Sequence, residues 1–456
     1  MIFKRHGFAK RNPCTTTISF LHPYAFSGGG GERVLWIAVN ALLKKYSHVH
    51  IVIHCKENCL ESSDQIYQGI EKVFGIEIFD KKRISFSSLA ISEYCIRSKL
   101  YPTFTLLGQI IAYFFVGLES IIRFPTDIVI DTTGMPSSLF VWKVFSDATC
   151  ISYVHYPFVS GSMINKVRSA TDASFNNSGF IAKYPFVREM KVFYYRYLEL
   201  LYLLIGRTND LVFVNSTWTG NHMRKLWGVE CITLYPPCDT REFGLKEFSF
   251  NRTIVSVGQF RPEKDHRLQL QALSYLKSKS KEAYKLHLVG GARDEADLAL
   301  VEELRRYSQE LDIADSVEFH VNLEFKKLLN LMKRSFVSIH TMHEEHFGIS
   351  IVEGMSMGLI TVANRSGGPL YDIIGSDAES CGFLASDSTE YGEILYKIFH
   401  EMSHDQLERM SQQSSQKAAR FSCEKFEKIW GQQIGERKIS NRSTDSEIST
   451  HSVIDD

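Results

Sequence analysis

Residues 344–354 read EEHFGISIVEG, the most specific pattern in the chain. The apolar run Phe336–His340 before it is typical of a buried strand, and the residues from Gly348 onward are typical of a helix. Glu345 and Glu353 have seven residues between them, so Glu345 falls in the loop and Glu353 about a turn and a half inside the helix. Two such carboxylates can bind two hydroxyl-bearing parts of one ligand, with the helix N-terminal amides binding a phosphate between them. The alternative is an exposed pair of glutamates.

Short apolar runs alternate with helical patterns on both sides of this stretch. Such alternation predicts βαβ units and parallel sheets buried on both faces. A proline pair, Pro236-Pro237, interrupts the succession and predicts a hinge. We therefore expect an α/β protein with two Rossmann-like domains, 1–240 and 241–435, facing each other across a cleft, with the last helices packing back on the first domain. The predicted strands are 16–21, 48–55, 127–131, 149–154 and 211–215, then 253–258, 286–290, 316–320, 336–340 and 359–363.

Length and composition agree with two large domains. The chain has 456 residues, of which 44% are hydrophobic and 23% are charged, which excludes collagen-like, wholly disordered and polytopic membrane proteins. The 52 basic and 52 acidic residues cancel, so no global basic field exists to bind nucleic acid. Nine scattered cysteines without a CxxC pair form neither a disulfide framework nor a cysteine zinc site, and they fit a reducing compartment.

The two ends of the chain are polar. The basic head Met1–Arg11 is followed by Asn-Pro-Cys-Thr-Thr-Thr rather than by an apolar stretch, so we expect no cleavable signal peptide. Residues 436–456 contain no aromatic side chain and recurrent serines, and this composition predicts a solvated, disordered tail.

Two apolar segments of the first half suggest contact with a membrane. Residues 104–122 are long enough to span a bilayer, but Gln109 and Glu119 would be costly in its core. Residues 184–206 predict an amphipathic helix with basic residues beside its apolar stripe, which suits a membrane interface. The alternative is a pair of core helices. The predicted stripe consists of Val187, Met190, Tyr194, Tyr197, Leu201 and Leu204.

Three further loops follow predicted strands and carry candidate binding residues. Gly28–Gly31 lies between a strand and a helix, where bare backbone can approach a phosphate, although it matches neither GxGxxG nor a P-loop and can also be a flexible turn. His155 follows the strand 149–154, where it can point toward a ligand or be a structural histidine. Arg261 and Lys264 follow the strand 253–258; they can neutralise a diphosphate or form a solvated turn with Glu263.

Taken together, four motifs resemble those of a known family. The stretches FLHPYAFSGGGGERVLW, YVHYPF, GQFRPEKDH and EEHFGISIVEGM resemble those of retaining GT-B glycosyltransferases, and among them the GDP-mannose-dependent α-1,2-mannosyltransferases of the dolichol-linked oligosaccharide pathway. The resemblance runs from about residue 16 to about residue 435. It implies an enzyme that transfers mannose from GDP-mannose to a dolichol-diphosphate-linked oligosaccharide for asparagine-linked glycosylation.

The resemblance also implies roles for individual residues. Glu345 would contact the donor mannose, Glu353 the ribose hydroxyls, and Arg261 and Lys264 the diphosphate, helped by backbone amides of Phe347, Gly348 and Ile349. His155 would lie near the anomeric carbon, and the glycine loop, including Gly29 and Gly30, near the donor phosphates or the acceptor. The wider superfamily usually has arginine directly after the strand glycine, where this chain has Gln259. If the strand continues to Arg261, both residues point to one face and Arg261 can substitute.

Several expectations about the reaction follow. No Asp-x-Asp motif follows a strand, so we expect metal-independent catalysis without a cofactor, with Arg261 and Lys264 stabilising the leaving phosphate. The family resemblance places the enzyme at the endoplasmic reticulum membrane with its domains facing the cytosol, and adds other mannosyltransferases of the pathway as partners. The alternatives are another nucleotide sugar or acceptor, and a catalytically silent membrane scaffold.

Overall fold

The structure is a computed structural model that describes residues 15–26, 29–56, 63–97, 100–101, 104–157, 185–375 and 378–436. The chain divides into two compact units, and each is described by itself. Unit 1 comprises the chain up to Asn215, Thr219–Leu234 and the residues from Glu427 on, and unit 2 comprises Ser216–Trp218 and Tyr235–Phe426. Gly28, Phe158 and residues 437–456 of the predicted tail lie outside the described residues.

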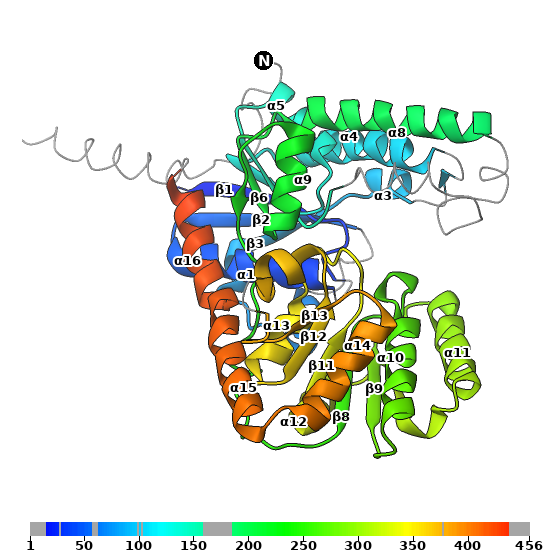
Figure 1. The fold of residues 1–456 in the computed structure, drawn as a ribbon. Helices are drawn as coiled ribbons and strands as arrows, with labels where there is room; N and C mark the ends of the chain where they lie inside the picture. The colour runs from blue at the N-terminus through cyan, green and yellow to red at the C-terminus, as the bar shows by residue number, and fades with distance from the viewer. Residues whose placement is uncertain are drawn as a thin grey trace, which may run out of the picture. The chain divides into compact units, whose positions relative to one another are not determined.

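Unit 1 is built on a parallel sheet of seven strands in the order β3-β2-β1-β4-β5-β6-β7 (Figure 1). Every residue of the central strand β1 is buried, which explains its run of apolar and small side chains. The strands are β1 Thr16–Leu21, β2 Val49–Cys55, β3 Ile84–Ser88, β4 Ile128–Asp131, β5 Thr149–Val154, β6 Leu211–Val214 and β7 Ile232–Thr233.

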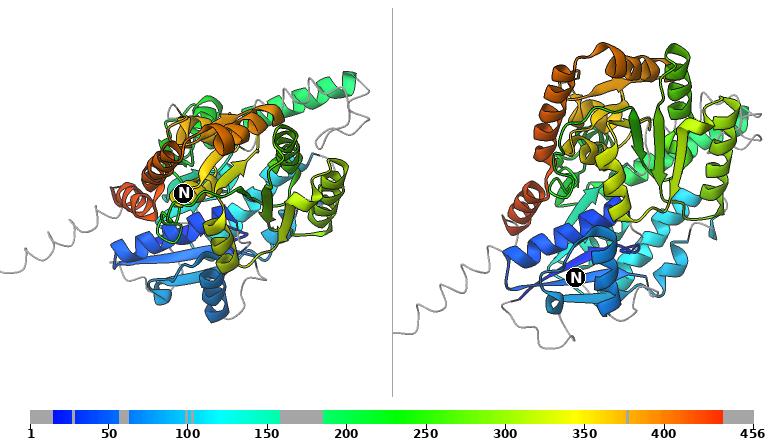
Figure 2. Two further views of the ribbon diagram at one scale, coloured as in Figure 1. Left: turned by 60° about the horizontal axis from the view of Figure 1, so that its bottom comes forward. Right: turned by 90° about the horizontal axis from the view of Figure 1, so that it is seen from below.

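Helices cover the sheet of unit 1 in the manner of a doubly wound fold (Figures 1 and 2). The helix α1 begins directly after the glycine loop, where the Gly29 N–H donates to Glu32 Oε2 at 2.8 Å, and all of its residues from Arg33 to Leu43 are buried. The helices are α1 Gly30–Lys45, α2 Ser63–Phe74, α3 Ser92–Cys95, α4 Thr105–Arg123, α5 Pro136–Phe145, α8 Pro185–Gly206 and α9 Thr217–Trp227.

Unit 2 repeats this architecture with a six-stranded parallel sheet in the order β10-β9-β8-β11-β12-β13. Its strands are β8 Thr253–Val257, β9 Lys285–Gly290, β10 Val317–Val321, β11 Val337–His340, β12 Ile360–Asn364 and β13 Phe383–Ala385. Its helices are α10 His266–Lys279, α11 Glu295–Glu310, α12 Phe325–Arg334, α13 Ile349–Ser356, α14 Ser388–Tyr396 and α15 His404–Ala418, and α16 Cys423–Ile434 leads back to unit 1.

These sheets confirm the predicted α/β fold with two parallel-sheet halves. All ten predicted strands are present within a residue or two of the expected bounds. Three edge strands were not predicted, namely β3, β7 and β13. The reason is that runs of two to five residues at a sheet edge show little hydrophobic pattern.

The helix α8 has two apolar stripes, one buried and one exposed, and Met190, Tyr197 and Leu204 of the predicted stripe belong to the exposed one. The side chains that pack into the core of unit 1 are those of Val192, Tyr195, Leu198, Tyr202 and Ile205. A second stripe, Phe186, Met190, Phe193, Tyr197, Leu200 and Leu204, is 52–76% exposed. Tyr194 and Leu201 of the predicted stripe are partly buried against that core, because periodicity alone does not show which apolar residues face protein.

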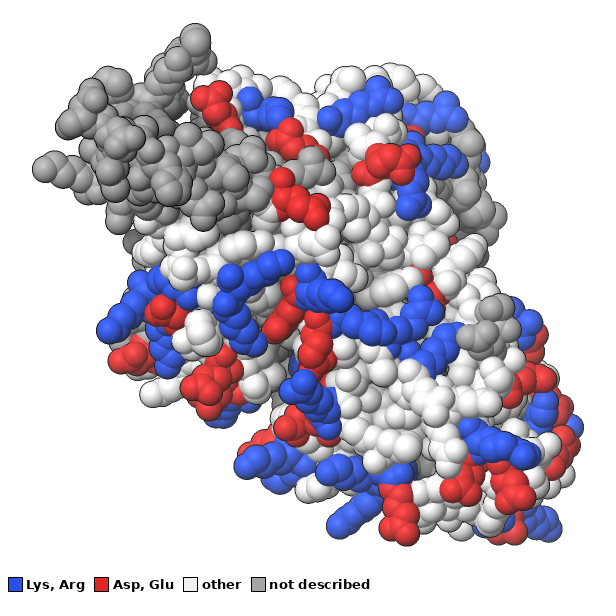
Figure 3. Space-filling view, turned by 90° about the vertical axis from the view of Figure 1, so that its left-hand side faces the viewer, with Lys and Arg blue, Asp and Glu red and all other residues white. Residues whose placement is uncertain are grey.

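Charged side chains of both signs are spread over the surface. Figure 3 shows Lys and Arg interspersed with Asp and Glu over the face that it draws. This distribution is in keeping with the net charge of zero.

Candidate active site

The order of the strands places one site in unit 2. In a doubly wound sheet, ligands bind beyond the carboxyl ends of the strands at the point where the order reverses. In unit 2 this point lies between β8 and β11, which are neighbours in the sheet although some 80 residues separate their ends in the chain. The loop after β8 contains Lys264, and the loop after β11 contains Glu345.

Lys264, Glu345 and His340 form a compact charged cluster at this point. The Lys264 Nζ lies 2.5 Å from Glu345 Oε2, and the His340 Nε2 lies 3.0 Å from the same oxygen. Glu345 and His340 side chains are only 12% and 6% exposed. Because an ionised carboxylate can only accept, the His340 ring donates its Nε2–H to Glu345.

The electrostatics of the cluster keep Glu345 ionised. Burial by itself would raise the pKa of Glu345, but Lys264 and the His340 hydrogen bond outweigh it and hold that pKa well below its ordinary value. Burial lowers the pKa of His340, although Glu345 opposes this shift. The cluster therefore presents a carboxylate, a cation and an imidazole side by side.

A set of buried hydrogen bonds fixes the turn that carries Lys264. The Thr341 hydroxyl lies 2.9 Å from the Lys264 carbonyl and 3.0 Å from the Asp265 carbonyl. Gln269, which lies on α10, donates to the Thr341 hydroxyl at a distance of 2.8 Å. These contacts tie the loop after β8 to the end of β11, so the position of Lys264 is set before any ligand binds.

The loop after β12 packs against the backbone of Glu345. The Gly368 N–H donates to the Glu345 carbonyl at 2.7 Å. A Cβ added at Gly367, which has φ +56°, would lie 2.2 Å from that carbonyl oxygen. Only a glycine fits here, and the contact holds the Glu345 loop in place.

The helix α13 begins where the sequence predicts. Gly348 precedes it with φ +111°, and the buried Phe347 anchors the loop in the core. Ile349 is the first residue of the helix, and Glu353 lies on it, partly buried. The free amides at the start of this helix are available to an anion.

The condition under which Arg261 could replace the usual arginine, a strand that continues to Arg261, is not met. The strand ends at Val257, and Arg261 lies in extended backbone before a 3-10 turn, Pro262–Lys264. Its Nη1 is 4.0 Å from Glu263 Oε1, and burial together with Arg293 lowers its pKa. Strand alternation therefore does not place Arg261 on the same face as Gln259, where the usual arginine would lie.

Unit 1 has a polar cluster at its own reversal point, between β1 and β4. His22 follows β1, and its Nδ1 lies 2.6 Å from the hydroxyl of Thr132, which follows β4. Its Nε2 lies 3.7 Å from Glu32 Oε1, and Glu32 in turn caps the Gly29 N–H. The predicted Gly29 and Gly30 lie beside this cluster at the start of α1.

His155 lies after β5, as predicted, and its ring packs against Tyr153 at 4.9 Å between centroids. A Cβ added at Gly31 would lie 3.5 Å from the His155 Nε2, so the glycine loop and this histidine are neighbours in unit 1. The structure thus brings His155 to the end of the glycine loop that the sequence singled out.

His340, Thr341, His22 and Thr132 were not among the predicted site residues. Each lies at, or directly after, the carboxyl end of a strand beside a reversal point. Their signal in the sequence is a polar residue at the end of an apolar run, but the reversal points emerge only from the strand order.

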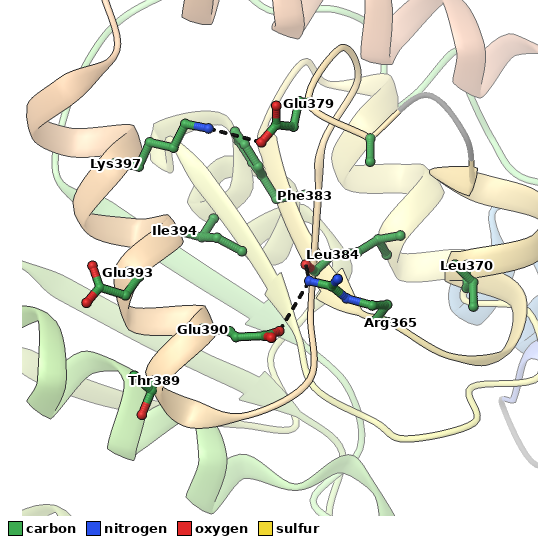
Figure 4. Close-up of a pocket in the computed structure, with 11 residues that line it drawn as sticks. Arg365, Leu370, Glu379, Phe383, Leu384, Thr389, Glu390, Glu393, Ile394 and Lys397 are labelled. Atoms are coloured by element: carbon green, nitrogen blue, oxygen red, sulfur yellow. Dashed lines mark hydrogen bonds and ion pairs between the residues drawn. The ribbon is translucent and has the colours of Figure 1, made fainter.

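A separate pocket of about 630 Å³ lies beside the edge strand β13 (Figure 4). Its cations are neutralised within the pocket: Arg365 lies 3.2 Å from Glu390, and Lys397 lies 3.0 Å from Glu379. Apolar side chains such as Phe383 form part of its wall. None of the predicted site residues lines this pocket.

Family models match both halves of the chain. The model described as ALG11 mannosyltransferase N-terminus matches residues 15–227, and the model described as Glycosyl transferases group 1 matches residues 241–417. Among solved structures, sucrose-phosphate synthase from Thermosynechococcus elongatus superposes with a TM-score of 0.67 at 16% identity, covering 92% of this chain and 98% of that chain. A glycosyltransferase from Rickettsia africae gives 0.64 at 14% identity, covering 92% and 98%. These likenesses confirm the GT-B fold.

Sequence relatives narrow the family further. The GDP-Man:Man(3)GlcNAc(2)-PP-Dol alpha-1,2-mannosyltransferase of Dictyostelium discoideum is 37% identical over 92% of this chain and 83% of its own length. Its human counterpart is 38% identical over 90% and 85%, and that of Caenorhabditis elegans is 34% identical over 94% and 92%. On this evidence the chain belongs to the family of GDP-Man:Man(3)GlcNAc(2)-PP-Dol alpha-1,2-mannosyltransferases.

Proposed function

We propose that this chain transfers mannose from GDP-mannose to a dolichol-diphosphate-linked oligosaccharide and forms an α-1,2 linkage. The relatives that bear this activity in their names match it over most of their length. The observation that carries the proposal is the Lys264–Glu345–His340 cluster at the reversal point of unit 2. It offers a cation for a diphosphate and a carboxylate for sugar hydroxyls within one hydrogen bond of each other.

Lys264 stabilises the leaving diphosphate in this mechanism. As the mannosyl carbon acquires oxocarbenium character, negative charge grows on the GDP phosphate, and a preorganised cation lowers the barrier. The ammonium has three donors, so it can hold the Glu345 carboxylate and a phosphate oxygen at the same time. Arg261 and the amides around Phe347, Gly348 and Ile349 assist it, and Glu353 binds the ribose hydroxyls.

Glu345 binds the hydroxyls of the donor mannose. Its depressed pKa keeps it an acceptor throughout the neutral range, and His340 fixes the orientation of the carboxylate. The mannose is then held in one pose relative to the diphosphate. We further propose retention through attack of the acceptor hydroxyl on the face that the diphosphate leaves, with His155 near the anomeric carbon.

The catalysis is proposed to be metal-independent. Lys264 and Arg261 supply the positive charge that a divalent ion supplies in enzymes with an Asp-x-Asp motif, which this sequence lacks after its strands. Turnover that persists in excess chelator supports this part of the proposal, and turnover that returns only on addition of a divalent ion contradicts it.

Transfer of labelled mannose to a lipid-linked acceptor tests the function. Lys264→Ala and Glu345→Gln are each expected to lower kcat/KM by about a hundredfold or more, the scale of a lost transition-state contact. Lys279→Ala, which removes an exposed ion pair with Glu393 in the same unit, is the matched control and keeps full activity. Unchanged transfer by both site variants contradicts the assignment, and stronger competition by UDP than by GDP identifies another donor.

The helix α4 is proposed to lie along a membrane surface. Within the described residues it is the helix whose length and apolar composition would suffice to cross a bilayer. Its inner side is bound to unit 1, however: Glu119 accepts from the Ser92 N–H and hydroxyl at 2.8 and 2.7 Å, and Trp142 donates to Ser120 at 2.9 Å. A spanning α4 would lose these partners and expose Glu119 to lipid.

Both α4 and α8 carry exposed apolar side chains on unit 1. The two helices are joined where Tyr194 accepts from the Leu107 N–H at 3.1 Å and packs on Phe104. Ile111, Phe115 and Ile122 of α4 are exposed, as are the residues of the outer stripe of α8. An apolar surface of this extent suits the headgroup boundary of a bilayer, where the lipid acceptor resides. We propose the cytosolic face of the endoplasmic reticulum, with other mannosyltransferases of the pathway as neighbours.

Alkaline extraction of membranes separates the two arrangements of α4. An interfacial helix is expected to release the protein into the supernatant at high pH, whereas a spanning helix keeps it in the pellet. Recovery in the pellet after extraction would contradict the interfacial arrangement.

A further inference from the structure

Three potential metal ligands meet on the two outer strands of the unit 2 sheet. His287 lies on β9, and Glu318 and His320 lie on the edge strand β10. Glu318 pairs with His287 in the parallel register, and His320 is two residues farther along. Residues two apart in a strand point to one face, so all three side chains project from the same side of the sheet.

The ligand atoms are spaced as a small metal ion requires. His287 Nδ1 lies 3.1 Å from His320 Nε2 and 3.3 Å from Glu318 Oε2, and His320 Nε2 lies 3.7 Å from that same oxygen. A triangle with these sides has a point about 2 Å from all three corners, which is the usual zinc–nitrogen and zinc–oxygen distance. Only small side-chain adjustments are needed to place the ion slightly out of the plane of the three atoms, as tetrahedral coordination requires.

We propose that His287, Glu318 and His320 form a binding site for a divalent transition-metal ion of the zinc type. Two imidazoles and one carboxylate are the ligand set that zinc accepts in sites with three protein ligands, and a water takes the fourth position. Glu318 is about half exposed, so an ion can reach the site from solvent. Lys285 lies 3.6 Å from Glu318 Oε1, which leaves Oε2 for the metal.

The proposed ion stabilises the edge strand β10 of the unit 2 sheet. The strand β10 has a neighbour, β9, on one side only, and the ion links the two strands through side chains in addition to their backbone hydrogen bonds. The site shares no residue with the Lys264–Glu345–His340 cluster. The proposed role of the ion in holding the edge strand is therefore compatible with metal-independent transfer.

Cobalt is a suitable probe because tetrahedral Co²⁺ has intense visible absorption. Titration of the chelator-treated full chain with Co²⁺ is expected to give a tetrahedral spectrum at one equivalent, and Zn²⁺ is expected to displace it and raise the melting temperature. His287→Gln, His320→Gln and the surface change Glu318→Gln should each weaken binding at least tenfold. His343→Gln, an exposed histidine whose ring nitrogen lies 4.0 Å from a single glutamate, is the control and leaves binding unchanged.

Two results would overturn the proposal. One is an octahedral spectrum, or none, at micromolar protein with equimolar Co²⁺. The other is a thiolate-to-cobalt charge-transfer band, which places the ion on cysteine. Each variant is first required to melt within a few degrees of the parent in chelator, and Glu318→Gln keeps the test decisive if a histidine variant misfolds. Transfer activity in chelator is recorded separately, because its loss bears on the mechanism and not on this site.

Discussion

His54 is a fully buried histidine near the carboxyl end of β2, where its Nε2 lies 3.1 Å from the Ser19 hydroxyl. Burial lowers its pKa to about 3, with a smaller contribution in the same direction from Arg123 and an opposing one from Glu119. In the unfolded chain a histidine titrates near 6.5, so below this pH the unfolded state binds a proton that the folded state does not. The stability that His54 contributes is thus complete above about pH 6.5 and is lost as the pH falls toward 3.

We predict that His54 alone lowers the free energy of unfolding by about 2 kcal/mol between pH 6.5 and pH 5. Urea denaturation of the parent and of His54→Gln at both pH values checks this, since glutamine keeps a polar group for Ser19 and does not titrate. The variant should lose about that much less stability on acidification. Parallel stability curves for the two proteins would contradict the assignment.

The strand β9 ends at Gly290, where any larger residue would overlap with the backbone of a neighbouring loop. A Cβ added there would lie 2.0 Å from the Gly258 carbonyl oxygen, whereas one added at Gly291 meets no atom closer than 3.6 Å. We predict that Gly290→Ala costs about 3 kcal/mol of stability, because backbone must move to relieve the overlap. Gly291→Ala, the matched control, is expected to stay close to the parent. Thermal unfolding measures both, and equal melting temperatures would refute the predicted contact.

The outer stripe of α8 is a second element whose exposed side chains can be tested by substitution. Phe186 and Phe193 are 76% and 74% exposed, so changing them does not disturb the core of unit 1. The double variant Phe186→Glu/Phe193→Glu is predicted to bind phospholipid vesicles at least tenfold more weakly, because two aromatic rings no longer enter the interface. Vesicle sedimentation measures the effect. Leu298→Glu, at a half-exposed position on α11 of unit 2, should bind like the parent, and a double variant that does so too would refute the membrane surface.

At the scale of the whole molecule, the last described helix returns to the first unit. Trp430 of α16 is buried in unit 1, where it packs on Phe213 at 5.1 Å and donates to the Ala38 carbonyl at 3.2 Å. The core of unit 1 is therefore completed by residues that follow unit 2 in the sequence. A truncation before Glu427 would remove part of the unit 1 core.

Trp430→Ala is accordingly predicted to destabilise unit 1 by about 3–5 kcal/mol while unit 2 keeps its stability. Hydrogen exchange can resolve this, with protection lost in β1, β5 and β6 and retained in β8, β11 and β12. Ile429→Ala, at the exposed neighbouring position of the same helix, is the control and should preserve both patterns. Loss of protection in unit 2 as well would show that the two units unfold together.

The sequence by itself determined the features that are encoded locally. Buried strands are visible as β-branched apolar runs, and Gly348 marks the start of α13. Helix geometry then places Glu353 within the helix and Glu345 in the loop before it. Each of these depends on residues within a turn or two of one another, so the pattern is legible without the rest of the chain. The parallel α/β fold and the loops that carry Lys264, Glu345 and His155 were predictable on this basis.

Only the tertiary structure decided which of these residues meet. Lys264 and Glu345 are 81 positions apart, and their contact depends on β8 and β11 being neighbours, which follows from strand order. The choice between the two apolar stripes of α8 likewise depends on packing between distant segments. The end of β8 at Val257 belongs here too, because it decides that strand alternation does not orient Arg261. The physical reason is the same throughout: contacts between remote residues are set by sheet register and side-chain packing, which no local pattern records.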